Sequence, residues 1–125
     1  MKYEDKERDI TIEQLLAQTS GIPGDITEEN RYSKQYDSIE NIVNFAKGKR
    51  LNHVPGETFE YSNMNYDILG LIVQKASHQS YANYLSTHLF TPLHMTQSTV
   101  KESNMKKNND AQGYVIKKGK AYADN

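Results

Sequence analysis

The chain has 125 residues, a formal net charge of −1 and no cysteine. This length fits one domain or a part of one, and the lack of cysteine excludes disulfides and a thiol nucleophile. Leu, Ile, Val and Phe together make up a fifth of the residues, so we expect a thin hydrophobic core. The near-neutral charge gives no reason to expect a nucleic-acid partner, and no apolar run reaches the roughly 20 residues of a membrane span.

The first predicted helix follows a charged lead-in over residues 1–10, which lacks the apolar centre of a signal peptide. Thr11 and Gln14 have the spacing of a capping box, in which each side chain bonds the backbone amide of the other residue. Apolar residues recur at helical spacing within 12–16. We expect the helix to end near Gly21, because glycine suits the left-handed conformation that often ends a helix.

Three further helices are predicted from apolar periodicity. One covers residues 39–47 and is capped by Asp37 or Ser38. The next covers residues 63–76, and apolar side chains occupy so much of its circumference that we expect it to be mostly buried. The last covers residues 81–90 and should turn its two tyrosines and two leucines inward.

The end of the chain is polar from residue 96 onward. Residues 113–116 and 120–123 are predicted to pair as a hairpin around a turn at 117–119. We therefore divide a single partial domain, residues 1–125, into a helical region over 11–95 and a polar tail over 96–125. Two strands alone are only marginally stable.

The stretch before the third predicted helix holds the candidate site. Pro55 and Gly56 fit the two central positions of a type II turn. The residues that follow are predicted to be extended, and residues two apart in an extended chain point the same way. Tyr61 and Asn63 should therefore share one face, with Ser62 turned to the other.

Short patterns alone do not establish a site here. About one Tyr-x-Asn match is expected by chance in this composition, and a second pair, Tyr81 and Asn83, lies inside a predicted helix, where residues two apart diverge. Ser-x-x-Lys occurs at 98–101 and at 103–106, but neither match opens an apolar helix that would bury the lysine. The four histidines lack metal-ligand spacing, so we predict no metal site.

Four blocks in order nevertheless resemble the penicillin-recognising serine hydrolases, the group of class C β-lactamases, DD-peptidases and related esterases. Residues 11–23 resemble the helix L-L-x-H-T-S-G-L/I of that family. Residues 55–63 resemble its P-G-x-x-F-x-Y-S-N block. Residues 69–73 and 84–95 resemble the blocks L-G-x-I-I/V-E and Y-x-x-x-x-I-F-x-P-L-G-M that follow.

This resemblance implies a fold and a chemistry. The family pairs an α/β half with an all-helical half, and the chain resembles the helical half: a mainly α fold of about four helices with a short C-terminal hairpin. Carried over by position, Tyr61 is the catalytic proton shuttle and Asn63 binds the substrate. The implied substrates are β-lactams, D-alanyl peptides of the peptidoglycan type or esters. No cofactor is implied, and the family usually works outside the cytoplasmic membrane or in the cell envelope.

Two parts of the family's site do not occur in this sequence. No Ser-x-x-Lys precedes Thr11, and there is no Lys-Thr-Gly or His-x-Gly motif. A tyrosine phenol ordinarily has a pKa near about 10, so it acts as a base only beside cations that favour the phenolate. We therefore expect the chain alone to be inactive, and we expect its exposed face to favour a homo-oligomer.

Two alternatives remain open. The chain could be a non-catalytic helical binding module of the same ancestry. It could also be an unrelated four-helix protein with accidental matches, which predicts that Tyr61 and Asn63 are buried and point apart.

Overall fold

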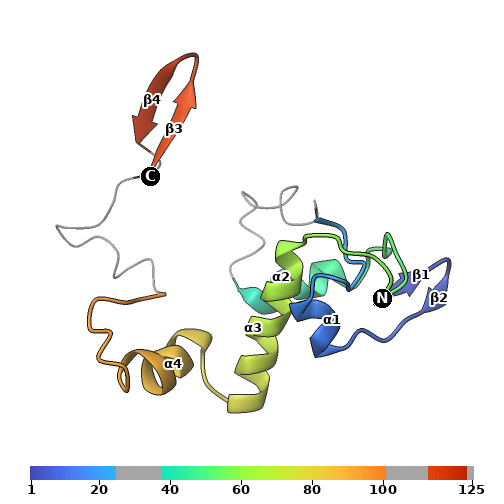
Figure 1. The fold of residues 1–125 in the computed structure, drawn as a ribbon, viewed down its shortest axis with the longest axis horizontal. Coiled ribbons are helices and arrows are strands. Elements are labelled where there is room, and N and C mark those ends of the chain that lie inside the picture. Colours follow the sequence, from blue (N-terminus) through green and yellow to red (C-terminus); the bar gives the residue numbers. More distant parts are fainter. Residues whose placement is uncertain (25–37, 101–112, 124–125) are drawn as a thin grey trace. The chain divides into compact units, whose positions relative to one another are not determined.

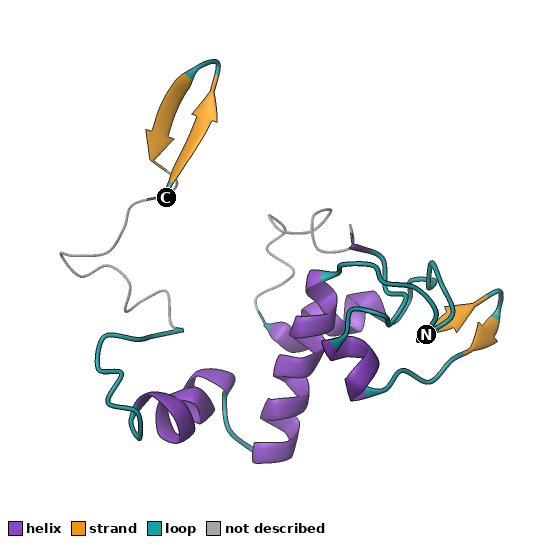
Figure 2. Cartoon of the chain, in the orientation of Figure 1, coloured by secondary structure: helices purple, strands orange, loops and turns teal. Residues whose placement is uncertain are grey.

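The computed structural model describes residues 1–24, 38–100 and 113–123 (Figure 1). The chain divides into two compact units, residues 1–84 and 85–125. The first unit holds strands β1 (Lys2–Tyr3) and β2 (Lys6–Glu7) and helices α1 (Ile12–Leu16), α2 (Ile39–Ala46) and α3 (Asn63–Ser77). Helix α4 (Tyr81–Leu85) reaches the boundary between the units, and the π-helical stretch η2 (Ser86–Phe90) and strands β3 (Tyr114–Lys117) and β4 (Lys120–Ala123) belong to the second. Figure 2 colours these elements by type.

The helix starts follow the predicted caps. At α1, the backbone amide of Thr11 donates to Gln14 Oε1 at 3.0 Å and the amide of Gln14 donates to Thr11 Oγ1 at 3.2 Å, which confirms the capping box. Ser38, one of the two predicted caps, accepts the amide of Asn41 at 3.3 Å and opens α2. Helix α1 ends earlier than predicted, at Leu16, and the first left-handed residue after it is Gln18 (φ 59°).

A small apolar core lies between α1, α2 and α3, and α3 packs against both of the other helices. Its buried residues are Leu15, Ile22, Val43, Ala46, Leu51 and Met64. Gly70 marks the crossing of α2 and α3, because a Cβ there would lie 2.9 Å from Ile39 Cδ1.

Helix α3 is less buried than predicted. Met64, Asn65 and Gly70 are its buried residues, whereas four apolar side chains of the same helix are only partly buried: Ile68, Leu69, Leu71 and Ile72. The reason is that, among the described residues, its main helical neighbours are α1 and α2, which leave part of its circumference uncovered. No helix in the described part of the chain combines the length and the apolar character needed to cross a membrane.

The predicted helix over residues 81–90 is present but changes type. Ser80 Oγ accepts the amide of Asn83 at 3.2 Å at its start. Over Ser86–Phe90 the pitch widens, and the amide of Thr91 donates to the carbonyl of Ser86 five residues earlier. Tyr81 and Leu89 are 38% and 40% exposed, so the prediction that they face inward was wrong. Leu89 lies in the π-helical stretch, where the α-helical period of 3.6 no longer holds.

One of the two hairpins was predicted from the sequence and the other was not. Strands β3 and β4 pair antiparallel around Lys118 and Gly119, which confirms the predicted hairpin. Both turn residues have positive φ, the conformation of a type I′ turn. The pairing of β1 with β2 was missed, since residues 1–10 were expected to be a plain lead-in. Strands of two residues carry no periodicity, and their turn contains no glycine.

Candidate active-site segment

Tyr61 and Asn63 form a hydrogen-bonded pair at the start of α3. The phenol oxygen of Tyr61 donates to Asn63 Oδ1 at 2.9 Å. Both side chains are exposed, Tyr61 by 62%, whereas Ser62 between them is fully buried. The predicted arrangement of one shared face, with Ser62 turned away, is confirmed. The alternative in which the two side chains are buried and point apart is wrong.

The Asn63 side chain does not cap α3. Ser62 is the residue that precedes the helix, and its hydroxyl donates to the carbonyl of Pro23 at 3.1 Å instead of capping. Asn63 Oδ1 accepts the phenol, while its Nδ2 group donates to none of the described residues. An exposed amide N–H pair of this kind can donate to a carbonyl oxygen of a bound molecule.

A buried polar network lies behind the pair; its members are Gln18, Ser20, Ser62 and Asn65, each at most 7% exposed. Gln18 Oε1 accepts the backbone amide of Ser62 at 2.9 Å and also accepts Asn65 Nδ2. Ser20 Oγ donates to Asn65 Oδ1 and accepts the amide of Ile22 at 3.1 Å. The network therefore joins the chain after α1 to the first turn of α3.

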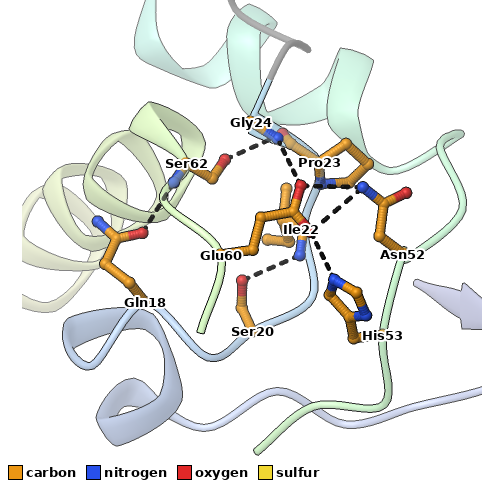
Figure 3. A network of polar contacts seen from close by, with 9 residues as sticks. All are labelled: Gln18, Ser20, Ile22, Pro23, Gly24, Asn52, His53, Glu60 and Ser62. Atoms are coloured by element: carbon orange, nitrogen blue, oxygen red, sulfur yellow. Dashed lines mark hydrogen bonds and ion pairs between the residues drawn. The ribbon is translucent and has the colours of Figure 1, made fainter. Parts of the chain in front are cut away.

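Glu60, the residue directly before Tyr61, is held by contacts to the segments around residues 24 and 52 (Figure 3). Its carboxylate accepts Asn52 Nδ2 at 2.9 Å and the backbone amide of Gly24 at 3.2 Å. The Nε2 atom of His53 also lies 3.0 Å from this carboxylate. These three contacts to its carboxylate hold Glu60 in one place. They therefore also fix the backbone that leads into Tyr61.

Backbone hydrogen bonds also join the segment after α1, residues 18–21, to residues 52–60. The amides of Asn52, Gly56 and Glu60 donate to the carbonyls of Gly21, Thr19 and Gln18, at distances between 2.7 and 2.9 Å. Gly21 has φ 77°, and a Cβ there would lie 2.3 Å from the carbonyl oxygen of His53. Glycine is therefore required by the close approach of two backbones, in addition to its left-handed conformation.

The predicted type II turn is present. The amide of Glu57 donates to the carbonyl of Val54 at 3.2 Å, and Gly56 has the positive φ, 95°, that this turn needs at its third position. The turn reverses the chain so that residues 56–60 return along the segment after α1.

Sequence reasoning missed the buried network. Its clearest signal was Asn65, a polar residue in an apolar helix at a position that proves to be fully buried.

Burial also raises the pKa of the Asp67 carboxyl, one helical turn beyond Asn63. Among the residues that the structure describes, no lysine ammonium is hydrogen-bonded to the Tyr61 phenol.

The other sequence patterns give no second site in the described ranges. Tyr81 and Asn83 lie in α4, as predicted. Of the two Ser-x-x-Lys matches, Lys101, Ser103 and Lys106 lie outside the described residues. Within 1–24, 38–100 and 113–123, no group of three or more His, Asp or Glu side chains is placed to hold a metal ion.

Comparison with known proteins identifies the family of this chain. Residues 2–124 match the Beta-lactamase family. The chain is 47% identical over 116 residues to Protein flp of Staphylococcus aureus and 31% identical over 97 residues to Penicillin-binding protein 4* of Bacillus subtilis. These matches cover 93% and 73% of the chain but only 23% and 21% of the two relatives.

Solved structures agree with the sequence comparison. The octameric penicillin-binding protein homologue from Pyrococcus abyssi is 30% identical with a TM-score of 0.78, covering 91% of this chain and 28% of that one. A D-stereospecific amidohydrolase from Streptomyces has a TM-score of 0.73 at 22% identity, which is a likeness of fold. The described elements thus form part of a β-lactamase-like fold. The chain belongs to the Beta-lactamase family of penicillin-recognising serine hydrolases.

Proposed function

We propose that the chain is the helical part of a β-lactamase-like serine hydrolase and carries the Tyr-Ser-Asn portion of its active site. The observation that carries this proposal is the exposed, hydrogen-bonded pair of Tyr61 and Asn63 in front of a buried network. Residues that are rigidly supported yet open to solvent are suited to binding and catalysis. The family match covers nearly the whole chain and supports the same assignment.

The proposed reaction proceeds through an acyl-enzyme. A serine oxygen attacks the carbonyl carbon of a β-lactam, a D-alanyl peptide or an ester, and the bond to the leaving nitrogen or oxygen breaks. Water then hydrolyses the acyl-serine ester. Tyr61 carries the serine proton to the leaving group, and the Asn63 Nδ2 group donates to a carbonyl oxygen of the substrate, because Oδ1 is already occupied by the phenol.

The nucleophile and the cations that would favour a phenolate come from outside these 125 residues. The chain spans about a quarter of the length of the relatives that it matches, which leaves room for both in a longer protein. Ile12, Leu16 and Phe59 are each more than half exposed. These apolar side chains support packing against the rest of a hydrolase domain or, in the isolated chain, against a second copy.

Covalent labelling tests the proposal. A fluorescent penicillin and a D-alanyl thioester are incubated with the 125-residue chain and with the product of the complete gene. We expect no labelling of the chain and labelling of a serine outside it in the complete product, located by mass spectrometry of the labelled peptide. A label on a serine within residues 1–125 contradicts the proposal. A complete gene product that neither reagent labels and that hydrolyses no ester supports the non-catalytic binding module instead.

A further inference from the structure

We infer that Gln18 is a positioning residue, whose side-chain carbonyl fixes the orientation of the Tyr61–Asn63 pair. The functional meaning of this inference rests on the proposed function, whereas its geometry does not. Gln18 lies 44 residues from Ser62 in sequence, yet Gln18 Oε1 accepts the Ser62 backbone amide at 2.9 Å. That amide belongs to the peptide bond that joins Tyr61 to Ser62, so its direction sets where both neighbouring side chains point.

Gln18 supplies an acceptor that the Ser62 amide needs. Ser62 precedes α3 and is fully buried, so its amide has neither a helical partner nor water. A buried amide without an acceptor costs free energy. The same Gln18 oxygen also accepts Asn65 Nδ2, from the first turn of α3. One carbonyl therefore fixes the extended segment and the start of the helix relative to each other.

The backbone of Gln18 takes the left-handed conformation that commonly ends a helix. Its amide donates to the carbonyl of Leu15 at 3.2 Å, and the next amide donates to the carbonyl of Gln14 at 2.9 Å. The φ of Gln18, 59°, is left-handed, a region that residues with a Cβ seldom occupy. The residue is only 7% exposed and accepts the amide of Glu60 through its own carbonyl at 2.9 Å. The end of α1 therefore fixes the backbone of the residue whose side chain reaches Ser62 and Asn65. In the family's helix L-L-x-H-T-S-G-L/I, a histidine occupies the position of Gln18.

Two substitutions separate the side chain from the backbone. Gln18→Gly removes the carbonyl acceptor and relieves the left-handed backbone, so the chain should still fold. Gln18→Glu keeps an acceptor oxygen at the same reach. The matched control is Gln74→Ala, because Gln74 Oε1 also accepts a backbone amide, that of Tyr81 at 3.0 Å, away from the candidate site.

Nuclear magnetic resonance of the 125-residue chain gives the local readout. In Gln18→Gly we expect the Ser62 amide to exchange about tenfold faster with solvent. The Tyr61 ring and Asn63 side-chain signals should shift, while the Val43 amide in the core is unchanged. Gln18→Glu should restore the Ser62 protection, and Gln74→Ala should affect only the region of Tyr81. Unchanged Ser62, Tyr61 and Asn63 signals in Gln18→Gly would overturn the inference.

Kinetics of the complete gene product separate this inference from the proposed function. Gln18→Gly should lower kcat about tenfold with a smaller change in KM, because it misplaces groups needed in the transition state. Gln18→Glu should recover most of that loss. If Tyr61→Phe leaves turnover intact, the proposed function fails, and the exchange experiment still decides the role of Gln18. If Tyr61→Phe abolishes turnover but Gln18→Gly does not reduce kcat, the inference alone fails.

Discussion

The chain contains the same three-residue pattern twice, and the two copies behave differently. Tyr61 and Asn63 flank Ser62, whose backbone is extended just before α3 begins at Asn63, and their side chains meet at 2.9 Å. Tyr81 and Asn83 lie inside α4, and no hydrogen bond joins their side chains in the described structure. Side chains two apart converge on an extended chain and diverge on a helix. The backbone, more than the pattern, decides whether a tyrosine and an asparagine can act together.

The support behind the two pairs differs as well. The first pair stands in front of the buried polar network. Around the second pair, Gln74 accepts the amide of Tyr81 and Ser80 accepts the amide of Asn83. Those contacts satisfy free amides at a helix start and need no further explanation. The comparison therefore predicts chemistry at one pair and ordinary helix capping at the other.

The largest expected difference concerns turnover. In the complete gene product, Tyr61→Phe removes the transferable proton and should lower kcat/KM for a β-lactam or ester by at least about 100-fold. Tyr81→Phe removes the same oxygen from an exposed helix position and should change kcat/KM by less than about twofold. Steady-state rates with a chromogenic cephalosporin and an aryl ester measure both. Equal losses in the two variants would mean that the two pairs do not differ in function.

A smaller difference is expected in stability. Asn65→Leu leaves the Gln18 carbonyl and the Ser20 hydroxyl without their buried partner, so the free energy of unfolding should fall by about 2–4 kcal/mol. Asn83→Leu introduces the same side chain at an exposed site and should change it by less than about 0.5 kcal/mol. Urea unfolding of the 125-residue chain compares them. A harmless Asn65→Leu would show that the network does not stabilise the α3 start.

The smallest expected effect depends on pH and concerns Asp67. Burial raises the pKa of this carboxyl above its ordinary 3.8 in the folded chain, because the charged form loses hydration. Its contribution to stability is therefore fully present below pH 3.8 and is lost as the pH rises through the folded-state pKa. Asp67→Asn should be more stable than the wild type near pH 7 and gain nothing near pH 3. Urea unfolding midpoints of both proteins at the two pH values check this. A wild type that is more stable than Asp67→Asn near pH 7 would contradict it.

Local features of the fold were predictable because neighbouring residues determine them. The Thr11–Gln14 capping box, the Ser38 cap and the Pro55–Gly56 turn each depend on side chains or φ angles within four residues. The shared face of Tyr61 and Asn63 follows in the same way from the period of an extended chain. The resemblance of short blocks to one family then identified the correct group of proteins.

Two of the missed features depend on residues far apart in sequence. Gly21 was expected to end α1, but Gln18 takes the left-handed conformation first, and its side chain is bonded at residues 62 and 65. Gly21 is needed instead for its contact with the backbone of His53. Neither contact can be read from residues 11–23 alone, because the partners lie at residues 53, 62 and 65.

The span of these contacts has a consequence for how the site assembles. Hydrogen bonds of Gln18, Ser20, Pro23 and Gly24 to residues 60–65 join positions 36 to 47 apart in sequence. The first of them to form carries nearly all of the entropic cost of closing that long loop, and the others add little to it. The segment around Tyr61 is therefore cooperative: it is assembled with its whole set of contacts, or it is not assembled.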